Sequence, residues 1–148
     1  MTKKPIPGKS DISSVTPTSL PRYPFHVRMP AQFVQKWDEF AFSRGRLKRP
    51  YMLRVAIQLL EELPPPRLQD LVNDMRRLRD RETYHPLQDC NTKLPQELID
   101  RLDGFAVYHG RLTRPEILRL SLLVLEALPA AQLQSMIAAA RQQRTPGS

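Results

Sequence analysis

The sequence contains a single cysteine, Cys90, so the chain cannot form an intrachain disulfide. Long apolar runs are also missing. The longest stretch of mainly apolar residues, 117–128, is too short to span a bilayer and is interrupted by Arg119, so it predicts a buried helix. Because residues 1–20 contain no apolar run, we expect no signal peptide. These absences predict a cytoplasmic protein that makes no use of a membrane.

Acidic residues are scarce relative to basic ones. The chain has 15 Asp and Glu against 23 Lys and Arg, which gives a formal net charge of +8. The excess is uneven: residues 1–20 carry +2, residues 21–82 carry +5 and residues 83–148 carry +1. A balance of this size favours a polyanionic partner, which would be DNA, RNA or an acidic membrane surface. Charge alone does not separate these partners from an ordinary basic protein that has none.

The patterns of common enzyme and metal sites are absent as well. The three histidines have no Cys, Asp or Glu at ligand spacing, and no phosphate loop or nucleophile motif is present. We therefore expect a protein that is not an enzyme, with no catalytic residue, no metal and no cofactor. Cys90 lies in a predicted strand, and we expect it to face the interior rather than to react.

A gapless internal repeat organises the chain. Residues 30–76 align with residues 95–141 at an offset of 65. The matched residues include Gly45-Arg46-Leu47 with Gly110-Arg111-Leu112, Arg49-Pro50 with Arg114-Pro115, and Leu63-Pro64 with Leu128-Pro129. The repeat predicts four segments: a disordered basic arm over 1–22, a first repeat over 23–82, a second repeat over 83–141, and a frayed tail over 142–148. We expect the two repeats to form one folded unit.

Each repeat predicts one strand and three helices. The strands are expected over 25–30 and 90–95, and each ends at a proline, which cannot donate in a ladder but suits a first helical turn. Helical apolar spacing predicts first helices over 30–44 and 95–109, with Gly45 and Gly110 as left-handed caps. Second helices are expected from about Lys48 and Thr113, where Thr113 and Glu116 make a capping box, to Leu63 and Leu128. Third helices follow, and their apolar stripes are expected to extend the core or to make an oligomer contact. A linker is expected over 81–88.

A lone strand of about six residues leaves its backbone groups without partners. Two repeats supply two such strands, which favours an antiparallel pair between them. The fold class predicted is therefore mainly α with one two-stranded antiparallel β-ribbon, in which the two repeats form an intrachain pseudo-dimer and each carries an extra C-terminal helix.

This arrangement resembles the ribbon-helix-helix DNA-binding family, which includes the Arc and methionine repressors. The resemblance covers roughly residues 23–63 and 89–128, and it is carried by three segments: Phe25-His26-Val27-Arg28-Met29-Pro30, Leu94-Pro95-Gln96-Glu97-Leu98, and Gly110 to Ile117. Members are usually dimers of single copies. The duplication here is similar to the tandem accessory proteins of plasmid conjugation and T-DNA transfer. The resemblance implies a bacterial protein associated with the nucleoid or a plasmid.

The resemblance also implies a mode of binding in which the ribbon enters the major groove of double-stranded DNA. If Val27, Met29, Thr92 and Leu94 face the core, the alternating residues face outward. The base-contacting residues expected on that face are His26, Arg28, Asn91 and Lys93. Phosphate contacts are expected beside the N-termini of the second helices, from Arg46, Lys48, Arg49, Arg111, Thr113 and Arg114. Asp89 and Pro24 also face outward and fit the mode less well.

Other functions stay open on the sequence alone. The chain is expected to act as a transcriptional regulator or as a relaxosome accessory protein, and plasmid partition uses similar modules. A second class is a protein-interaction adaptor, antitoxin-like or relaxase-assisting, for which DNA is only an anchor. A third is a duplicated fold that has lost DNA binding. Further partners expected are a second copy of the chain or a relaxase-type protein.

Overall fold

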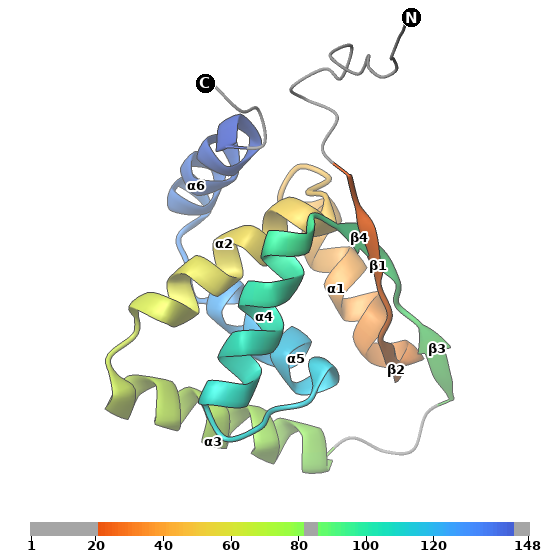
Figure 1. Cartoon of the computed structure of the whole chain (residues 1–148), viewed down its shortest axis with the longest axis vertical. Helices are drawn as coiled ribbons and strands as arrows, with labels where there is room; N and C mark the ends of the chain where they lie inside the picture. The colour runs from red at the N-terminus through yellow and green to blue at the C-terminus, as the bar shows by residue number, and fades with distance from the viewer. Residues whose placement is uncertain (1–20, 82–85, 144–148) are drawn as a thin grey trace, which may run out of the picture.

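A computed structural model describes residues 21–81 and 86–143 (Figure 1). Over these residues the chain is mainly helical, with six helices and a small antiparallel β-ribbon, as the sequence predicts. Residues 1–20 of the predicted arm, residues 82–85 and the last five residues of the predicted tail lie outside the described part.

The ribbon joins the two halves of the chain. β1 (Tyr23–Phe25) pairs with β4 (Thr92–Leu94), and β2 (Arg28–Pro30) pairs with β3 (Leu87–Asp89), both antiparallel. Phe25 lies opposite Thr92 and Arg28 lies opposite Asp89. Two residues separate the paired segments on each side, so the register continues from one pair to the next without a bulge. The expected antiparallel pairing between the two halves is therefore confirmed.

The strands differ from the predicted segments 25–30 and 90–95 in two respects. Each side of the ribbon consists of two strands of three residues, and both sides begin earlier than predicted, at Tyr23 and at Leu87, the latter inside the predicted linker. The division has a local cause. The backbone N–H of Cys90 donates to the carbonyl of Val27 at 2.7 Å, but the N–H of Val27 donates to the side-chain Oδ1 of Asn91 at 3.3 Å. An asparagine side chain thus takes a donor that would otherwise bond across the ladder.

Both prolines end their strand and begin a helix. α1 (Ala31–Ser43) has Pro30 at its N-cap, and α4 (Gln96–Tyr108) has Pro95 there. Gly45 and Gly110 follow these helices with φ of 100° and 94°, in the left-handed region where glycine is favoured. The predicted boundaries of the first helices and their glycine caps are therefore confirmed.

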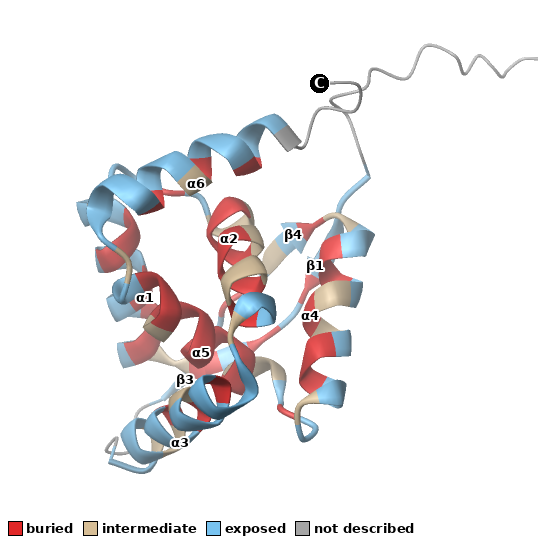
Figure 2. Ribbon diagram, turned by 90° about the vertical axis from the view of Figure 1, so that its left-hand side faces the viewer, coloured by how far each residue is buried: buried red, intermediate tan, exposed pale blue. Residues whose placement is uncertain are grey.

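The second helices form the centre of the molecule. α2 (Arg49–Glu62) packs against α5 (Arg114–Glu126), and most residues of α5 are buried (Figure 2). α3 (Pro65–Arg81) packs against α5, whereas α6 (Ala130–Gln143) packs against α2, so each third helix crosses to the other half of the chain. Because α6 ends at Gln143, the prediction of a frayed tail beginning at residue 142 is wrong for its first two residues.

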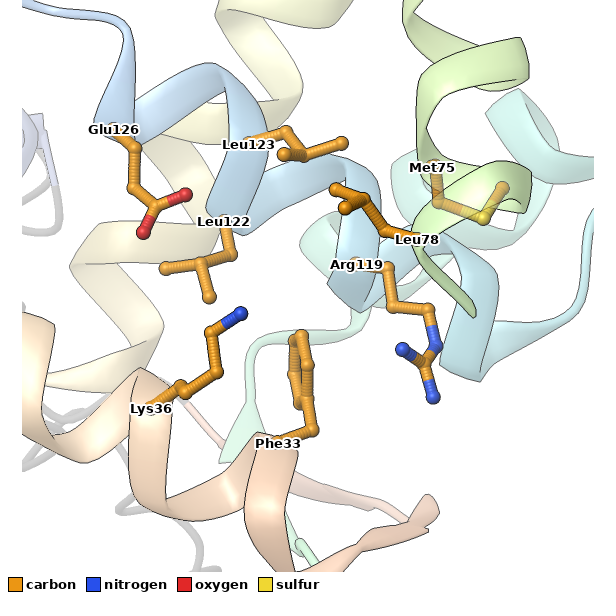
Figure 3. Close-up of a pocket in the computed structure, with 8 residues that line it drawn as sticks. All are labelled: Phe33, Lys36, Met75, Leu78, Arg119, Leu122, Leu123 and Glu126. Atoms are coloured by element: carbon orange, nitrogen blue, oxygen red, sulfur yellow. The ribbon is translucent and has the colours of Figure 1, made fainter. Parts of the chain in front are cut away.

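The stripe on α3 extends the core, which is one of the two roles predicted for it. Leu68, Val72 and Met75 are buried in the hydrophobic core. Met75 and Leu78 face α1 and α5 around a small cavity of about 30 Å³ (Figure 3). That space suits a water molecule and is far below the roughly 300–1,000 Å³ of small-molecule sites. The contact is therefore a packing junction rather than a ligand site.

Equivalent elements recur at the spacing found in the sequence. α1, α2 and α3 begin at residues 31, 49 and 65, and α4, α5 and α6 begin 65 residues later in each case, at 96, 114 and 130. The register of the ribbon follows the same spacing. His26 lies opposite Asn91, which is the residue that corresponds to it in the repeat.

Candidate nucleic-acid interface

One face of the ribbon is exposed along its whole length. Phe25, Val27, Met29, Cys90 and Leu94 are buried, and Thr92 is half-buried. The residues between them are exposed, and these are Pro24, His26, Arg28, Asp89, Asn91 and Lys93. The predicted alternation is therefore confirmed, and the structure brings the four predicted base-contacting residues together on one surface. We call this surface the outer face of the ribbon.

The cross-strand neighbours on the outer face differ between its two ends. At one end Arg28 lies opposite Asp89, and the Nε atom of Arg28 is 3.5 Å from Oδ1 of Asp89. At the other end Lys93 lies opposite Pro24. Within the described residues the ammonium group of Lys93 makes no ion pair. The outer face therefore carries a salt bridge at one end and a lone positive charge at the other.

The middle of the outer face is formed by His26 and Asn91. Since Asn91 Oδ1 accepts the N–H of Val27 at 3.3 Å, this side chain also stabilises the ribbon. Bidentate pairing with adenine needs the amide oxygen as an acceptor and the amide nitrogen as a donor. The amide nitrogen of Asn91 makes no hydrogen bond within residues 21–81 and 86–143 and is available to a base. Its amide oxygen would have to accept from both the Val27 N–H and the adenine.

The N-terminus of α5 is attached to the ribbon by Arg114. Its guanidinium bonds the carboxylate of Asp103 at 3.1 and 2.7 Å, and its Nη1 donates to the carbonyl of His26 at 3.5 Å. The bond to Asp103 raises the pKa of Arg114 above its ordinary value. These contacts hold the first turn of α5 beside the middle of the ribbon.

Thr113 and Glu116 form the predicted capping box at the start of α5. The Thr113 hydroxyl accepts from the backbone N–H of Glu116 at 3.3 Å, and Glu116 Oε1 accepts from the N–H of Thr113 at 2.9 Å. The other carboxylate oxygen, Oε2, accepts from Arg79 of α3 at 2.7 Å. Glu116 thus joins the end of α3 to the start of α5, a tertiary contact that the repeat pattern does not predict.

The start of α2 corresponds in the repeat to the start of α5. Arg49 bonds Asp38 at 3.0 Å, which repeats the pairing of Arg114 with Asp103. Lys48 is the N-cap residue, but its side chain makes no capping hydrogen bond. Burial raises the pKa of Cys90 above its ordinary value, which keeps the thiol protonated. The charges of Arg49 and Asp38 have opposite effects on the pKa of the Cys90 thiol, which Arg49 lowers and Asp38 raises.

Two of the predicted phosphate-contacting residues have an unusual backbone. Arg46 and Arg111 lie in the left-handed region with φ of 58° and 57°. Each precedes a leucine whose N–H closes the turn: Leu47 donates to Ala41 at 3.0 Å and Leu112 donates to Ala106 at 2.9 Å. A left-handed conformation costs an ordinary residue roughly 1–3 kcal/mol, and such residues cluster at functional sites. The sequence signal for this conformation is weak, because arginine has no preference for it.

The six predicted phosphate-contacting residues therefore divide into two groups. Arg49, Arg114 and Thr113 are engaged in ion pairs or in capping, and they fix the helix starts against the ribbon. Arg46, Lys48 and Arg111 are exposed and make no ion pair within the described ranges. A phosphate group that approached either helix start would meet these three cations first.

The described part of the chain offers neither a metal site nor a membrane span. Within it, no group of three or more His, Cys, Asp or Glu side chains is arranged to hold a metal ion. None of the described helices combines the length and apolar character needed to cross a bilayer.

Comparison of the chain with protein-family models, with curated proteins and with solved structures finds no match.

Proposed function

We propose that the two halves of this chain are ribbon-helix-helix repeats that form an intrachain pseudo-dimer, and that the molecule binds double-stranded DNA sequence-specifically by inserting the ribbon into the major groove. The observation that carries the proposal is the outer face of the ribbon. This face is exposed and bears Arg28 and Lys93, and it is flanked by two helix starts that carry exposed cations.

The pseudo-dimer is supported by the agreement between the repeat and the register. A two-fold axis between two repeats requires one residue of the ribbon to lie opposite its own counterpart. His26 and Asn91 meet this condition, because they are 65 residues apart and the continuous register sets them across from each other. The pairing of Arg49 with Asp38 and of Arg114 with Asp103 follows the same symmetry.

The dimensions and chemistry of the outer face suit the major groove. A groove about 12 Å wide admits a two-stranded ribbon, and its base edges present the acceptors that Arg28 and Lys93 need. The starts of α2 and α5 would then lie on either side of the groove, where helix N–H groups and the cations Arg46, Lys48 and Arg111 face phosphates. Base reading and backbone attraction are thereby assigned to different residues.

The proposal is tested by two groups of variants in fluorescence anisotropy with duplex DNA. Lys48→Ala and Arg111→Ala should weaken binding to all duplexes alike, and each lost phosphate contact should reduce the slope of log K against log salt by about 0.9. Arg28→Ala should instead reduce the difference in affinity between a selected duplex and a duplex of random sequence. Arg67→Ala, which removes an exposed cation near the start of α3, is the charge-matched control. Unchanged affinity and preference in all three variants would overturn the proposal.

A second candidate function is an adaptor that uses DNA only as an anchor. Phe42 and Val107 occupy corresponding positions near the ends of α1 and α4 and are 65% and 68% exposed, and Tyr108 is 84% exposed. Exposed apolar side chains of this kind favour a protein partner. Val107→Ser should leave DNA affinity unchanged in either case. Only an adaptor would lose its function in transcription or DNA transfer while it still bound DNA.

A further inference from the structure

The two ends of the outer face carry different chemistry at corresponding positions. Lys93 is the counterpart of Arg28 at the repeat offset of 65, and Asp89 is the counterpart of Pro24. Arg28 lies opposite Asp89, whereas Lys93 lies opposite Pro24. One end therefore has an arginine with a carboxylate beside it, and the other has a lysine beside a proline, which has no polar side-chain atom.

The ion pair is built at the ribbon surface rather than inside the molecule. The side chains of Arg28 and Asp89 are 67% and 69% exposed, so both are available to a ligand that covers the outer face. The contact at 3.5 Å is made by Nε of Arg28. Its two terminal nitrogens make no hydrogen bond within the described residues and are left to donate elsewhere.

Guanine and cytosine present complementary groups to such a pair. In the major groove guanine offers the acceptors O6 and N7, which suit a guanidinium, and cytosine offers the N4 amino group, which suits a carboxylate. O6 and N4 are neighbours within one G·C pair, as Arg28 and Asp89 are neighbours across one register position of the ribbon. An A·T pair presents its groups in a different order, with the N6 amino donor of adenine between the acceptors N7 and O4, so it lacks the two adjacent acceptors that a guanidinium can bond together.

On the basis of the DNA-binding function proposed above, we propose that Arg28 and Asp89 together read one G·C base pair, with Arg28 donating to guanine and Asp89 accepting from the N4 amino group of its cytosine. The Lys93 end contributes a point charge with little selectivity. The protein then recognises a non-palindromic site and binds it in one orientation, although its backbone is nearly two-fold symmetric.

Asp89 should weaken binding to DNA of random sequence while it favours the G·C pair. A carboxylate near phosphates is repelled by every duplex, and its cost is offset only where a cytosine amino group is available. This combination is the usual means of gaining specificity at the expense of affinity. Removing Asp89 should therefore raise the affinity for random DNA and lower the preference for the G·C pair, a pair of opposite changes that loss of a structural contact alone would not produce.

The inference is tested by selection from a duplex library with a random central segment, using the full chain, followed by Kd measurements on the selected duplex and on its G·C to A·T variant. The wild-type protein should select a motif with an invariant G·C pair at one end. Asp89→Ala should bind random duplex more tightly than wild type, and its preference for G·C at that position should fall by about five-fold or more.

The matched control introduces the same arginine and aspartate pair at the other end of the ribbon. Pro24→Asp combined with Lys93→Arg places the same two side-chain types opposite each other at the other end of the ribbon. This double variant should select a motif with a G·C pair at both ends and bind it in either orientation. All positions are on the exposed outer face, and thermal unfolding checks that each variant is folded.

The outcomes that contradict the inference are distinguishable from those that contradict DNA binding. If wild type binds no duplex above the level of a charge-matched protein, the proposed function is wrong, and this inference falls with it. If wild type selects a motif but Asp89→Ala keeps the same G·C preference, DNA binding stands and the paired reading is wrong. The paired reading is equally wrong if Asp89→Ala gains affinity for all duplexes without a change in preference, because Asp89 would then only repel.

Discussion

The guanidinium of Arg114 lies over the ring of Phe25, with 4.3 Å between Cζ and the ring centroid. Its counterpart Arg49 has no such ring beneath it, because residue 90, which corresponds to Phe25 in the repeat, is a cysteine. Together with the bond from Arg114 to the His26 carbonyl, this contact gives the start of α5 two interactions with the ribbon that the start of α2 lacks among the described residues.

This asymmetry predicts different costs for two equivalent substitutions. Arg114→Ala removes the ion pair with Asp103, the bond to the His26 carbonyl and the contact with Phe25, whereas Arg49→Ala removes only the ion pair with Asp38. A partly exposed cation–π contact contributes about 0.5–1 kcal/mol and an exposed ion pair about 0–1 kcal/mol. In urea unfolding, Arg114→Ala should lower the free energy of unfolding by about 1–2 kcal/mol, and Arg49→Ala by less. Equal losses would show that neither the Phe25 contact nor the bond to the His26 carbonyl stabilises the fold.

The double role of Glu116 predicts that it contributes more to the stability of the fold than its capping partner Thr113 does. Thr113→Ala removes one capping bond at the start of α5, which costs about 1 kcal/mol. Glu116→Ala removes the reciprocal capping bond as well as the acceptor for Arg79, and it should therefore cost more. A double-mutant cycle with Arg79→Ala measures the second contribution directly. A coupling of zero would mean that the contact between Glu116 and Arg79 does not stabilise the fold, and that α3 is held by its apolar stripe and by the ion pair of Arg76 with Glu116, 3.8 Å apart.

The raised pKa of Cys90 predicts a loss of stability in alkaline solution. Burial disfavours the thiolate in the folded state, so the folded protein holds this proton to a higher pH than the unfolded chain does. The protonated Cys90 thiol contributes to the free energy of unfolding. This contribution is fully present below the pKa of the thiol in the unfolded chain, about 8.5, and it is lost as the pH rises through the pKa in the folded protein. The free energy of unfolding should therefore fall above about pH 8.5, and it should fall less steeply in Cys90→Ala.

Lysines and tyrosines titrate in the same range, so the informative quantity is the difference between wild type and Cys90→Ala at each pH. A thiol reagent provides an independent readout. Cys90 should react slowly in the native protein and rapidly after unfolding in urea. Rapid reaction under native conditions would mean that the ribbon opens readily at this position.

The helices and the orientation of the ribbon could be predicted because their signals are local. Pro30 and Pro95 mark helix starts, Gly45 and Gly110 need a left-handed backbone, and the alternation around Val27 separates a buried face from an exposed one. Each of these preferences belongs to one or two residues and acts regardless of the rest of the chain. The repeat then made each prediction twice, which distinguished the pattern from chance.

Other features depended on contacts between distant residues. Predicting that Arg28 lies opposite Asp89 requires the register of the two strands. Alternation alone does not fix it, because a shift of two residues keeps the same side chains on the same face. The bond from the Val27 N–H to Asn91 interrupts the ladder, and although asparagine is disfavoured in strands, that preference does not reveal which backbone N–H its side chain takes. Leu87 could not be recognised as part of a strand, because all three residues of β3 are exposed and no alternation is present.

The left-handed backbone of Arg46 and Arg111 predicts a separation of stability from binding. Glycine adopts this conformation without the steric cost of a Cβ atom, so Arg111→Gly should raise the free energy of unfolding by up to about 1 kcal/mol. Arg46→Gly should raise it by less, because it also removes the contact of the Arg46 guanidinium with the Phe42 ring, whose centroid is 5.2 Å from Cζ. If the two side chains contact phosphates, the same substitutions should weaken binding to every duplex and reduce its salt dependence. Thermal unfolding and anisotropy on the same samples measure both effects. Gly45→Ala is the opposite control, since alanine at φ of 100° is strained and should lower stability without removing a charge. Variants that gained stability and kept full DNA affinity would remove both arginines from the proposed interface.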